Sequence, residues 1–521
     1  MLIERSSARI NGVLFFFVGA TLMTQTLAQL HMPAQTWNGA LSLAGTGSAL
    51  LDYFAKAGTY RNRAQADVDA DMEKIFADDE RLALALVFGV RLISRKPNVP
   101  GIDDAQTGYG QRDEFAKALV WLHAQRPDDL YRNLHLLPVF GCWRDLMSEP
   151  LLGTLDRQAV FALVRDNLDN ALLRKYLPTI RSGAKVRSDR DRARSQWAKE
   201  LCRFLGLREQ DYRKLKAEGP AHVFQRQMSR NQWEALNFNG IPGRAMTRLV
   251  SRTGKDKKTA LERHGQVERL LAWVREQPMV KFTGYAYELV RAARTRKDLV
   301  SREIFDRQFA TVLEPMRGHA LGNVLCALDT SGSMTCEVVP GVSAYDICIS
   351  LGIAFSSLNV GHFRDCVVAF GHTSNLVTLN GSFTKRLEQI ETMTTAWGST
   401  NFQSVIDLLT RIRQDNPSIP VEDYPSTLLV VSDMQFNPVE GNAQTNYQAA
   451  MQKLRAVGLG GMRIIWWFVN GAAKDFPSSM EDEGVYLVGG FDPAVLKGLM
   501  GLKGGGKPQN PTAEQTAEAK E

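Results

Sequence analysis

The sequence lacks the motifs that would identify a nucleotide-hydrolysing or disulfide-bonded protein. Its six cysteines show no disulfide or metal-ligand spacing, and its glycine run at residues 504–506 follows no strand-like segment, so we interpret it as a linker rather than a phosphate-binding loop. No nucleophile with a neighbouring general base is apparent. These absences favour a non-enzymatic protein, and the unpaired cysteines suit a reducing cytoplasm.

Long apolar segments are also scarce. Residues 12–23 form one behind Arg5 and Arg9, but it is short for a bilayer-spanning helix. It has the features of a signal-peptide apolar region, with residues 26–28 as a candidate cleavage site. Alternatively, Met32 is the true start and residues 1–31 are mis-assigned, which the free cysteines favour. No other segment could cross a membrane, so we expect no membrane partner.

Charge is unevenly distributed along the 521 residues. The formal net charge is +7, yet residues 161–260 alone carry 23 Lys or Arg and 10 Asp or Glu. A solvated basic face is the ordinary explanation of such a bias, and a polyanionic partner is the functional one.

Residues 32–318 are expected to form an all-α array. Five segments carry apolar residues at three- and four-residue spacing: Ser48–Ala57, Ala66–Phe76, Glu80–Ile93, Glu114–His123 and Arg157–Leu173. Asp79 and Asp156 lie where helix N-caps are expected. Many helices joined by short loops are typical of a HEAT-like array, although no fixed sequence period is visible. Whether the array closes into a ring is left open.

Residues 320–500 are expected to form an α/β domain. Strand-like runs at Val324–Asp329, Cys366–Phe370, Leu376–Leu379, Thr427–Ser432, Arg463–Val469 and Val485–Val488 alternate with helical segments at Tyr345–Leu358, Thr384–Met393, Phe402–Arg413 and Tyr447–Val457. This alternation predicts a doubly wound, Rossmann-like parallel sheet covered on both faces. Residues 503–521 have no apolar periodicity and are expected to be a disordered tail.

Oxygen-bearing side chains follow two of the predicted strands. Asp329, Ser331 and Ser333 come at the end of the first strand, and Asp433 ends the strand at 427–432. Thr400 lies in a loop before a predicted helix. In an open α/β sheet, ligands bind at the carboxyl ends of the strands, and hard divalent cations prefer oxygen ligands.

This D-x-S-x-S pattern, with the later Thr and Asp, resembles the metal-ion-dependent adhesion site of von Willebrand factor A (vWA) domains. The resemblance implies that Ser331, Ser333 and Thr400 offer hydroxyl oxygens to Mg²⁺ or Mn²⁺. Asp329 and Asp433 would act directly or through water, and an acidic protein partner would complete the coordination. The alternative is a vWA fold whose site is degenerate.

The helical region also resembles a known family. The segments Lys175–Ser182, Ala198–Gly206 and Asp211–Leu215 are similar to domain of unknown function family 2828. A helical array followed by a vWA domain is similar to the TROVE family of the Ro autoantigen. That similarity implies a ring of helical repeats that binds RNA, although architecture alone is weak evidence of function.

The basic stretch supplies the candidate RNA contacts. Lys185, Arg187, Arg190, Arg192 and Arg194 are expected to contact phosphates. The aromatic residues interleaved with them, such as Trp197, could stack on unpaired bases, but their helical spacing favours a place in the core.

Two functions follow from these features. The leading hypothesis is a non-enzymatic, cytoplasmic RNA-binding scaffold of the Ro/TROVE kind, with a Mg²⁺-dependent site for an acidic partner. The alternative is a vWA protein-interaction adaptor, for example for an ATPase complex, that binds no nucleic acid.

Overall fold

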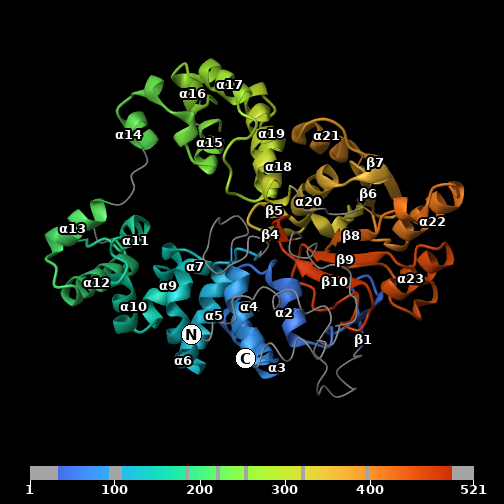
Figure 1. The fold of residues 1–521 in the computed structure, drawn as a ribbon, viewed down its shortest axis with the longest axis horizontal. Coiled ribbons are helices and arrows are strands. Elements are labelled where there is room, and N and C mark those ends of the chain that lie inside the picture. Colours follow the sequence, from blue (N-terminus) through green and yellow to red (C-terminus); the bar gives the residue numbers. More distant parts are fainter. Residues whose placement is uncertain are drawn as a thin grey trace, which may run out of the picture.

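A computed structural model (Figure 1) describes residues 33–92, 108–181, 187–218, 223–251, 256–317, 323–393 and 398–495. The predictions for residues 1–31 and 503–521, and for Lys185, lie outside these ranges. Within them, a helical region precedes a domain built on a mostly parallel sheet, so the predicted fold class is confirmed.

The first half of the helical region extends through the basic segment, which forms its last helices. Its helices are α2 (Ala49–Ala57), α3 (Gln65–Asp78), α4 (Glu80–Arg91), α5 (Asp113–Gln125), α6 (Pro127–Asn133), α7 (Leu137–Phe140), α8 (Trp143–Leu146), α9 (Glu149–Thr154), α10 (Arg157–Arg165), α11 (Ala171–Tyr176), α12 (Asp189–Phe204) and α13 (Glu209–Ala217). The second half contains α14 (Val223–Ser229), α15 (Gly243–Leu249), α16 (Ala260–Arg263), α17 (Val267–Glu276), α18 (Ala286–Thr295) and α19 (Leu299–Leu313).

Most of the predicted helices are present, but one segment predicted as a single helix forms two. Asp79 and Asp156 cap α4 and α10 through their side chains, as expected. The helix predicted at Arg157–Leu173 is instead two helices, α10 and α11. Asn170 caps the second by accepting bonds from the backbone N–H groups of Leu172 and Leu173. Apolar periodicity cannot detect such a break, because the apolar side chains continue past it.

A β-hairpin that the sequence pattern did not reveal precedes the helices. Strands β1 (Pro33–Gln35) and β2 (Leu41–Leu43) pair antiparallel. The connecting loop is closed by a hydrogen bond from the Thr36 backbone N–H to the Ala40 carbonyl, 3.0 Å, and by Gly39 at a φ of +86°. Strands of three residues carry too little alternation to be recognised.

The main sheet of the C-terminal domain has six strands in the order β10-β9-β8-β3-β6-β7. The strands are β3 (Val324–Asp329), β6 (Cys366–Phe370), β7 (Ser374–Thr378), β8 (Thr427–Ser432), β9 (Arg463–Phe468) and β10 (Val485–Gly489), and β4 (Glu337–Val339) and β5 (Val342–Ser343) form a separate short pair. The helices of this domain are α20 (Ala344–Leu358), α21 (Phe383–Met393), α22 (Gln403–Asp415) and α23 (Asn446–Ala456). Every residue of β3 and β8 is buried, so both faces of the sheet centre are covered.

One edge of the sheet departs from the predicted parallel arrangement. β7 pairs antiparallel with β6, whereas the other neighbouring strands are parallel. Only residues 371–373 separate the two strands, and a parallel connection needs a much longer crossover. The antiparallel edge therefore follows from the short loop.

Both ends of the helical region contact the C-terminal domain (Figure 1). α2 packs on β10, and α18 packs on α20. At the first contact the backbones approach closely, because a Cβ at Gly58 would lie 2.2 Å from the Gly489 carbonyl oxygen. The buried Lys56 of α2 donates hydrogen bonds to the carbonyls of Ala473 and Asp475, at 2.8 and 3.1 Å. The helical region thus begins and ends on the same domain.

Candidate functional site

The segment that follows β3 brings two of the predicted hydroxyls together. Asp329 is the last residue of the buried strand and is itself fully buried. Its Oδ1 accepts a hydrogen bond from the Ser331 backbone N–H, 2.9 Å, which folds the chain back at the strand end. The Ser331 and Ser333 hydroxyl oxygens lie 3.1 Å apart. The turn after the strand therefore places the Ser331 hydroxyl next to the Asp329 carboxylate and the Ser333 hydroxyl next to that of Ser331.

Thr400 lies in the neighbouring loop. The Gly332 backbone N–H donates to the Gly398 carbonyl, 3.2 Å, and so joins this loop to the one that carries Ser331 and Ser333. A second pair of bonds joins Thr400 to Asn437: the Asn437 backbone N–H donates to the Thr400 carbonyl at 2.8 Å, and the Asn437 side chain accepts from the Thr400 N–H at 3.2 Å. Thr400 is 1% exposed.

Asp433 follows β8, the strand that pairs with β3. Its side chain is buried and hydrogen bonds to the Ser333 hydroxyl. One carboxylate oxygen accepts from the Gln435 backbone N–H, 3.2 Å, and the other is buried with no hydrogen-bond partner in the part of the chain that the structure describes. The next residue, Met434, has a φ of +64°, an unusual conformation for a side chain of this size. The chain thus turns sharply at Asp433.

The two carboxylates of this cluster are electrostatically strained. Burial, and after it the neighbouring charge of Asp433, raise the pKa of Asp329 to about 7, although hydrogen bonds from Ser331 and Ser432 oppose the increase. Burial likewise raises the pKa of Asp433. In the described part of the chain, no salt bridge joins either carboxylate to Lys, Arg or His. Two buried acids without a compensating cation are costly.

The donor set suits a hard divalent cation. It consists of two carboxylates and three hydroxyls, all oxygen donors, and one buried carboxylate oxygen has no hydrogen-bond partner among the described residues. Within the described residues, no group of three or more His, Cys, Asp and Glu side chains is arranged so that it could hold a metal ion. A cation here would therefore depend on hydroxyl ligands as well as on Asp329 and Asp433.

The structure adds residues that the sequence analysis did not select. Ser432 donates to the second carboxylate oxygen of Asp329, 2.5 Å. Asn38, from the N-terminal hairpin, donates to Gln435 and contacts Thr400. Ser432 precedes Asp433 directly and could have been noticed from that position. Asn38 lies 362 residues from Thr400 and gives no local signal.

The predicted phosphate contacts are only in part free. Arg190 and Arg194 both pair with Glu149, at 2.9 and 2.8 Å. Arg192 pairs with Asp189 at 2.5 Å while remaining 74% exposed. Arg187 is exposed and lies two residues before α12 begins. Arg190, Arg192 and Arg194 lie on α12, and each of the three forms an ion pair with an acidic side chain of this chain.

The aromatic residues of the basic segment are mainly core residues. Trp197 and Tyr212 are buried, and the Trp197 ring packs edge-on against Phe161. The Tyr212 hydroxyl donates to the Pro178 carbonyl, 2.7 Å. Neither ring is available for stacking on a base, so the core interpretation is confirmed for both.

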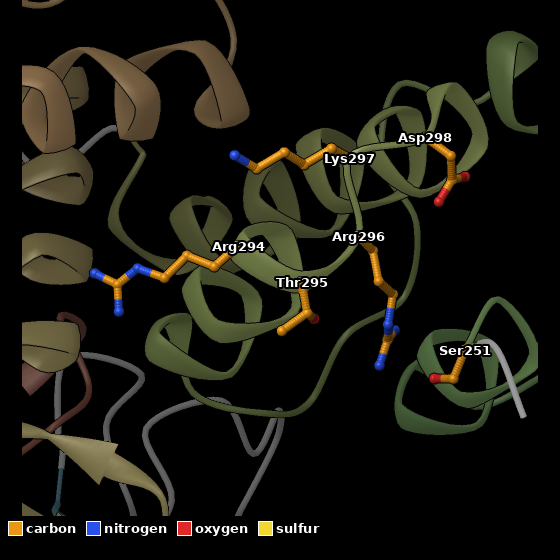
Figure 2. A pocket seen from close by; sticks show the side chains of 6 residues that line it. All are labelled: Ser251, Arg294, Thr295, Arg296, Lys297 and Asp298. Carbon is orange, nitrogen blue, oxygen red and sulfur yellow. The ribbon is translucent and has the colours of Figure 1, made fainter. Parts of the chain in front are cut away.

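A cavity of about 640 Å³ lies where α15 approaches the connection between α18 and α19 (Figure 2). Three of its lining residues, Arg294, Arg296 and Lys297, are basic. Arg294 and Lys297 extend away from Arg296, which points towards Ser251. Arg294 is also paired with Asp346 and Glu391. The charged groups therefore do not converge on one position, and this cavity is not a candidate site.

Fold and site together define a helical array that begins and ends on a mostly parallel α/β domain, with an oxygen-donor cluster at the strand ends. Two family models match the chain, one within the helical region and one over the C-terminal domain. Residues 36–161 match Domain of unknown function (DUF2828), which confirms the resemblance noted from the sequence. Residues 323–521 match a second family, Domain of unknown function (DUF7788). The family 2828 match covers less of the chain than the sequence motifs suggested.

Two individual proteins are similar over most of the chain. One is "Uncharacterized protein L728" of Acanthamoeba polyphaga mimivirus, which is 21% identical over 512 residues, with 89% of this chain and 84% of that protein covered. The other is the crystal structure of the Deinococcus radiodurans RO (RSR) protein. It is 16% identical with a TM-score of 0.39, and the match covers 87% of this chain and 98% of that one.

Proposed function

We propose that the chain is a non-enzymatic binding protein whose C-terminal domain holds Mg²⁺ or Mn²⁺ and, through it, a carboxylate of a protein partner. The observation that carries the proposal is the pair of buried carboxylates, Asp329 and Asp433, beside the Ser331 and Ser333 hydroxyls, with no cation of the described residues paired with either acid. A divalent cation would neutralise both acids. Because Mg²⁺ retains positions for outside oxygen ligands, the same ion would accept a partner's Asp or Glu.

The test is equilibrium Mn²⁺ binding to the full chain, measured by electron paramagnetic resonance of the free ion. We expect one bound Mn²⁺ per chain, displaced by excess Mg²⁺, and no bound ion in Asp329→Ala. Asp189→Ala is the matched control, since it removes an acid that is 93% exposed. Equal Mn²⁺ binding by Asp329→Ala and the wild type would contradict the proposal.

RNA binding is a second candidate, and the exposure of the α12 cations is what favours it. Arg190 and Arg192 are 68% and 74% exposed, so their surface ion pairs contribute little and an RNA phosphate could replace the carboxylate. The test is the affinity for a single-stranded RNA oligonucleotide at several salt concentrations. For the double variant Arg190→Gln/Arg192→Gln, we expect the salt slope to fall by about 1.4, since each phosphate contact on single strands contributes about 0.7. An unchanged slope would exclude these two contacts.

The proposed location is a reducing compartment such as the cytoplasm. All six cysteines are free in the structure. None of the helices in the described part of the chain is long and apolar enough to cross a membrane.

A further inference from the structure

The N-terminal hairpin is fixed to the loop that carries Asp433. The Thr36 hydroxyl donates to the Phe436 carbonyl, 2.7 Å, and the Trp37 backbone N–H donates to the Gln435 side-chain oxygen, 2.6 Å. β2 continues the attachment, because Leu43 and Phe476 exchange two backbone hydrogen bonds of 2.9 and 2.8 Å. The hairpin is therefore held in one position relative to the candidate site.

At the hairpin tip, Asn38 contacts a predicted metal ligand directly. Its side-chain amide donates to the Gln435 carbonyl at 2.5 Å and lies 3.5 Å from the Thr400 hydroxyl oxygen. Gln435 is in turn bonded through its backbone N–H to the Asp433 carboxylate, 3.2 Å. One side chain from the start of the chain thus spans two of the three loops that form the site.

The neighbouring residue, Trp37, presents an apolar surface at the same place. Its side chain is 65% exposed, the largest value among the exposed large hydrophobic residues of the described chain. Its backbone is fixed to Gln435, two residues from Asp433. Exposed tryptophans held on rigid backbone are typical of binding hot spots, because the ring covers a large area at little entropic cost.

We propose that the cation site is composite: Asn38 positions Thr400 and the Asp433 loop, and Trp37 forms an apolar contact beside the bound carboxylate. The partner is then an acidic peptide segment in which an apolar residue adjoins the Asp or Glu that reaches the cation. This inference rests on the proposed function. It means that residues matching one family, 36–161, complete a site whose ligands belong to the segment matching another, 323–521.

The role of Asn38 is tested with Mn²⁺ alone and the full chain. Asn38→Ala removes both contacts of the amide, so we expect Mn²⁺ affinity to fall about tenfold, equivalent to about 1.4 kcal/mol. Asn375→Ala, which truncates an exposed asparagine of β7, is the control and should leave the affinity unchanged. Thermal unfolding of each variant, recorded without metal, separates a local effect from loss of the fold. A folded Asn38→Ala with wild-type Mn²⁺ affinity overturns the positioning role.

The role of Trp37 is tested with two blocked peptides in the presence of saturating Mn²⁺. One is acetyl-Gly-Asp-Gly-amide and the other acetyl-Leu-Asp-Leu-amide. We expect the wild type to prefer the leucine peptide about fivefold, and Trp37→Ala to bind both equally while retaining Mn²⁺ affinity. Val360→Ala, at another exposed apolar position, should keep the preference. Because Trp37 is exposed, its truncation should not unfold the protein.

The outcomes separate this inference from the proposed function. Absence of Mn²⁺ binding in the wild type overturns both. If the wild type binds Mn²⁺ and Asp329→Ala does not, the cation site is supported. If the wild type also shows no preference for the leucine peptide, so that Trp37→Ala has none to lose, the apolar contact is overturned.

Discussion

The candidate cation site and the basic helix α12 are both rich in charged and polar side chains. They differ in how far the charged groups are buried and in whether a group of opposite charge is paired with them. At the site, Asp329 and Asp433 are buried and no cation of the described chain is paired with them. On α12, Arg190 and Arg192 are exposed and paired with Glu149 and Asp189. Buried, uncompensated charge is costly and points to an outside ligand, whereas exposed ion pairs are nearly neutral in free energy. The site is therefore the stronger functional candidate.

The largest expected effect comes from a buried charge that does have a partner. Asp145 accepts bonds from Arg91 and Arg112, and both Arg91 and Asp145 are 1% exposed. We expect Asp145→Ala to reduce the free energy of unfolding by about 3–5 kcal/mol, because it leaves the Arg91 charge buried and alone. Denaturant unfolding measures this loss. A loss no larger than that of the exposed Asp189→Ala would remove the distinction between buried and exposed charge.

The next effect concerns the two acids of the site. Without metal, Asp433→Asn should be at least as stable as the wild type, since it removes one of two mutually repelling buried charges. With Mg²⁺ at about 100 times its dissociation constant, the wild type should gain about 2.7 kcal/mol and the variant nothing. Thermal unfolding with and without Mg²⁺ measures both. Equal stabilisation of the two proteins would show that Asp433 is not a ligand.

A smaller, pH-dependent effect is expected at the contact between α2 and the C-terminal domain. Burial lowers the pKa of Lys56 from 10.5 to about 8, although the charge of Asp475 opposes the decrease. Between about pH 8 and 10.5 the unfolded chain binds this proton and the folded protein does not, so stability should rise with pH in that window.

Lys56→Met isolates this contribution. As pH rises from 8 to 10, the unfolding midpoint of the wild type should increase relative to that of the variant. Lys453→Met is the control, because that lysine is 39% exposed and pairs with Asp407. Parallel curves for wild type and Lys56→Met would show that the Lys56 pKa is not lowered.

The smallest effect belongs to the basic helix. Arg192→Gln breaks an exposed ion pair with Asp189, and we expect a change in stability of no more than about 0.5 kcal/mol. A loss above about 2 kcal/mol, measured by denaturant unfolding, would show that this pair contributes structurally and is not a surface available to RNA.

The sequence by itself determined the elements whose side chains repeat regularly. The predicted boundaries of β3, β6 and β8 agree with the structure residue for residue, because buried parallel strands are continuous apolar runs bounded by polar residues. It also determined which oxygen-bearing residues follow β3 and β8, since a strand end fixes where its loop begins.

Only the tertiary structure decided what lies beside those residues. The short hairpin at residues 33–43, the antiparallel β7 and the division of α10 from α11 depend on loop length and capping. The contact between Asn38 and Thr400 and the ion pairs of α12 with Glu149 depend on chain folding over long distances. A linear pattern records periodicity along one element, but which polar groups end up buried together is set by how distant elements pack.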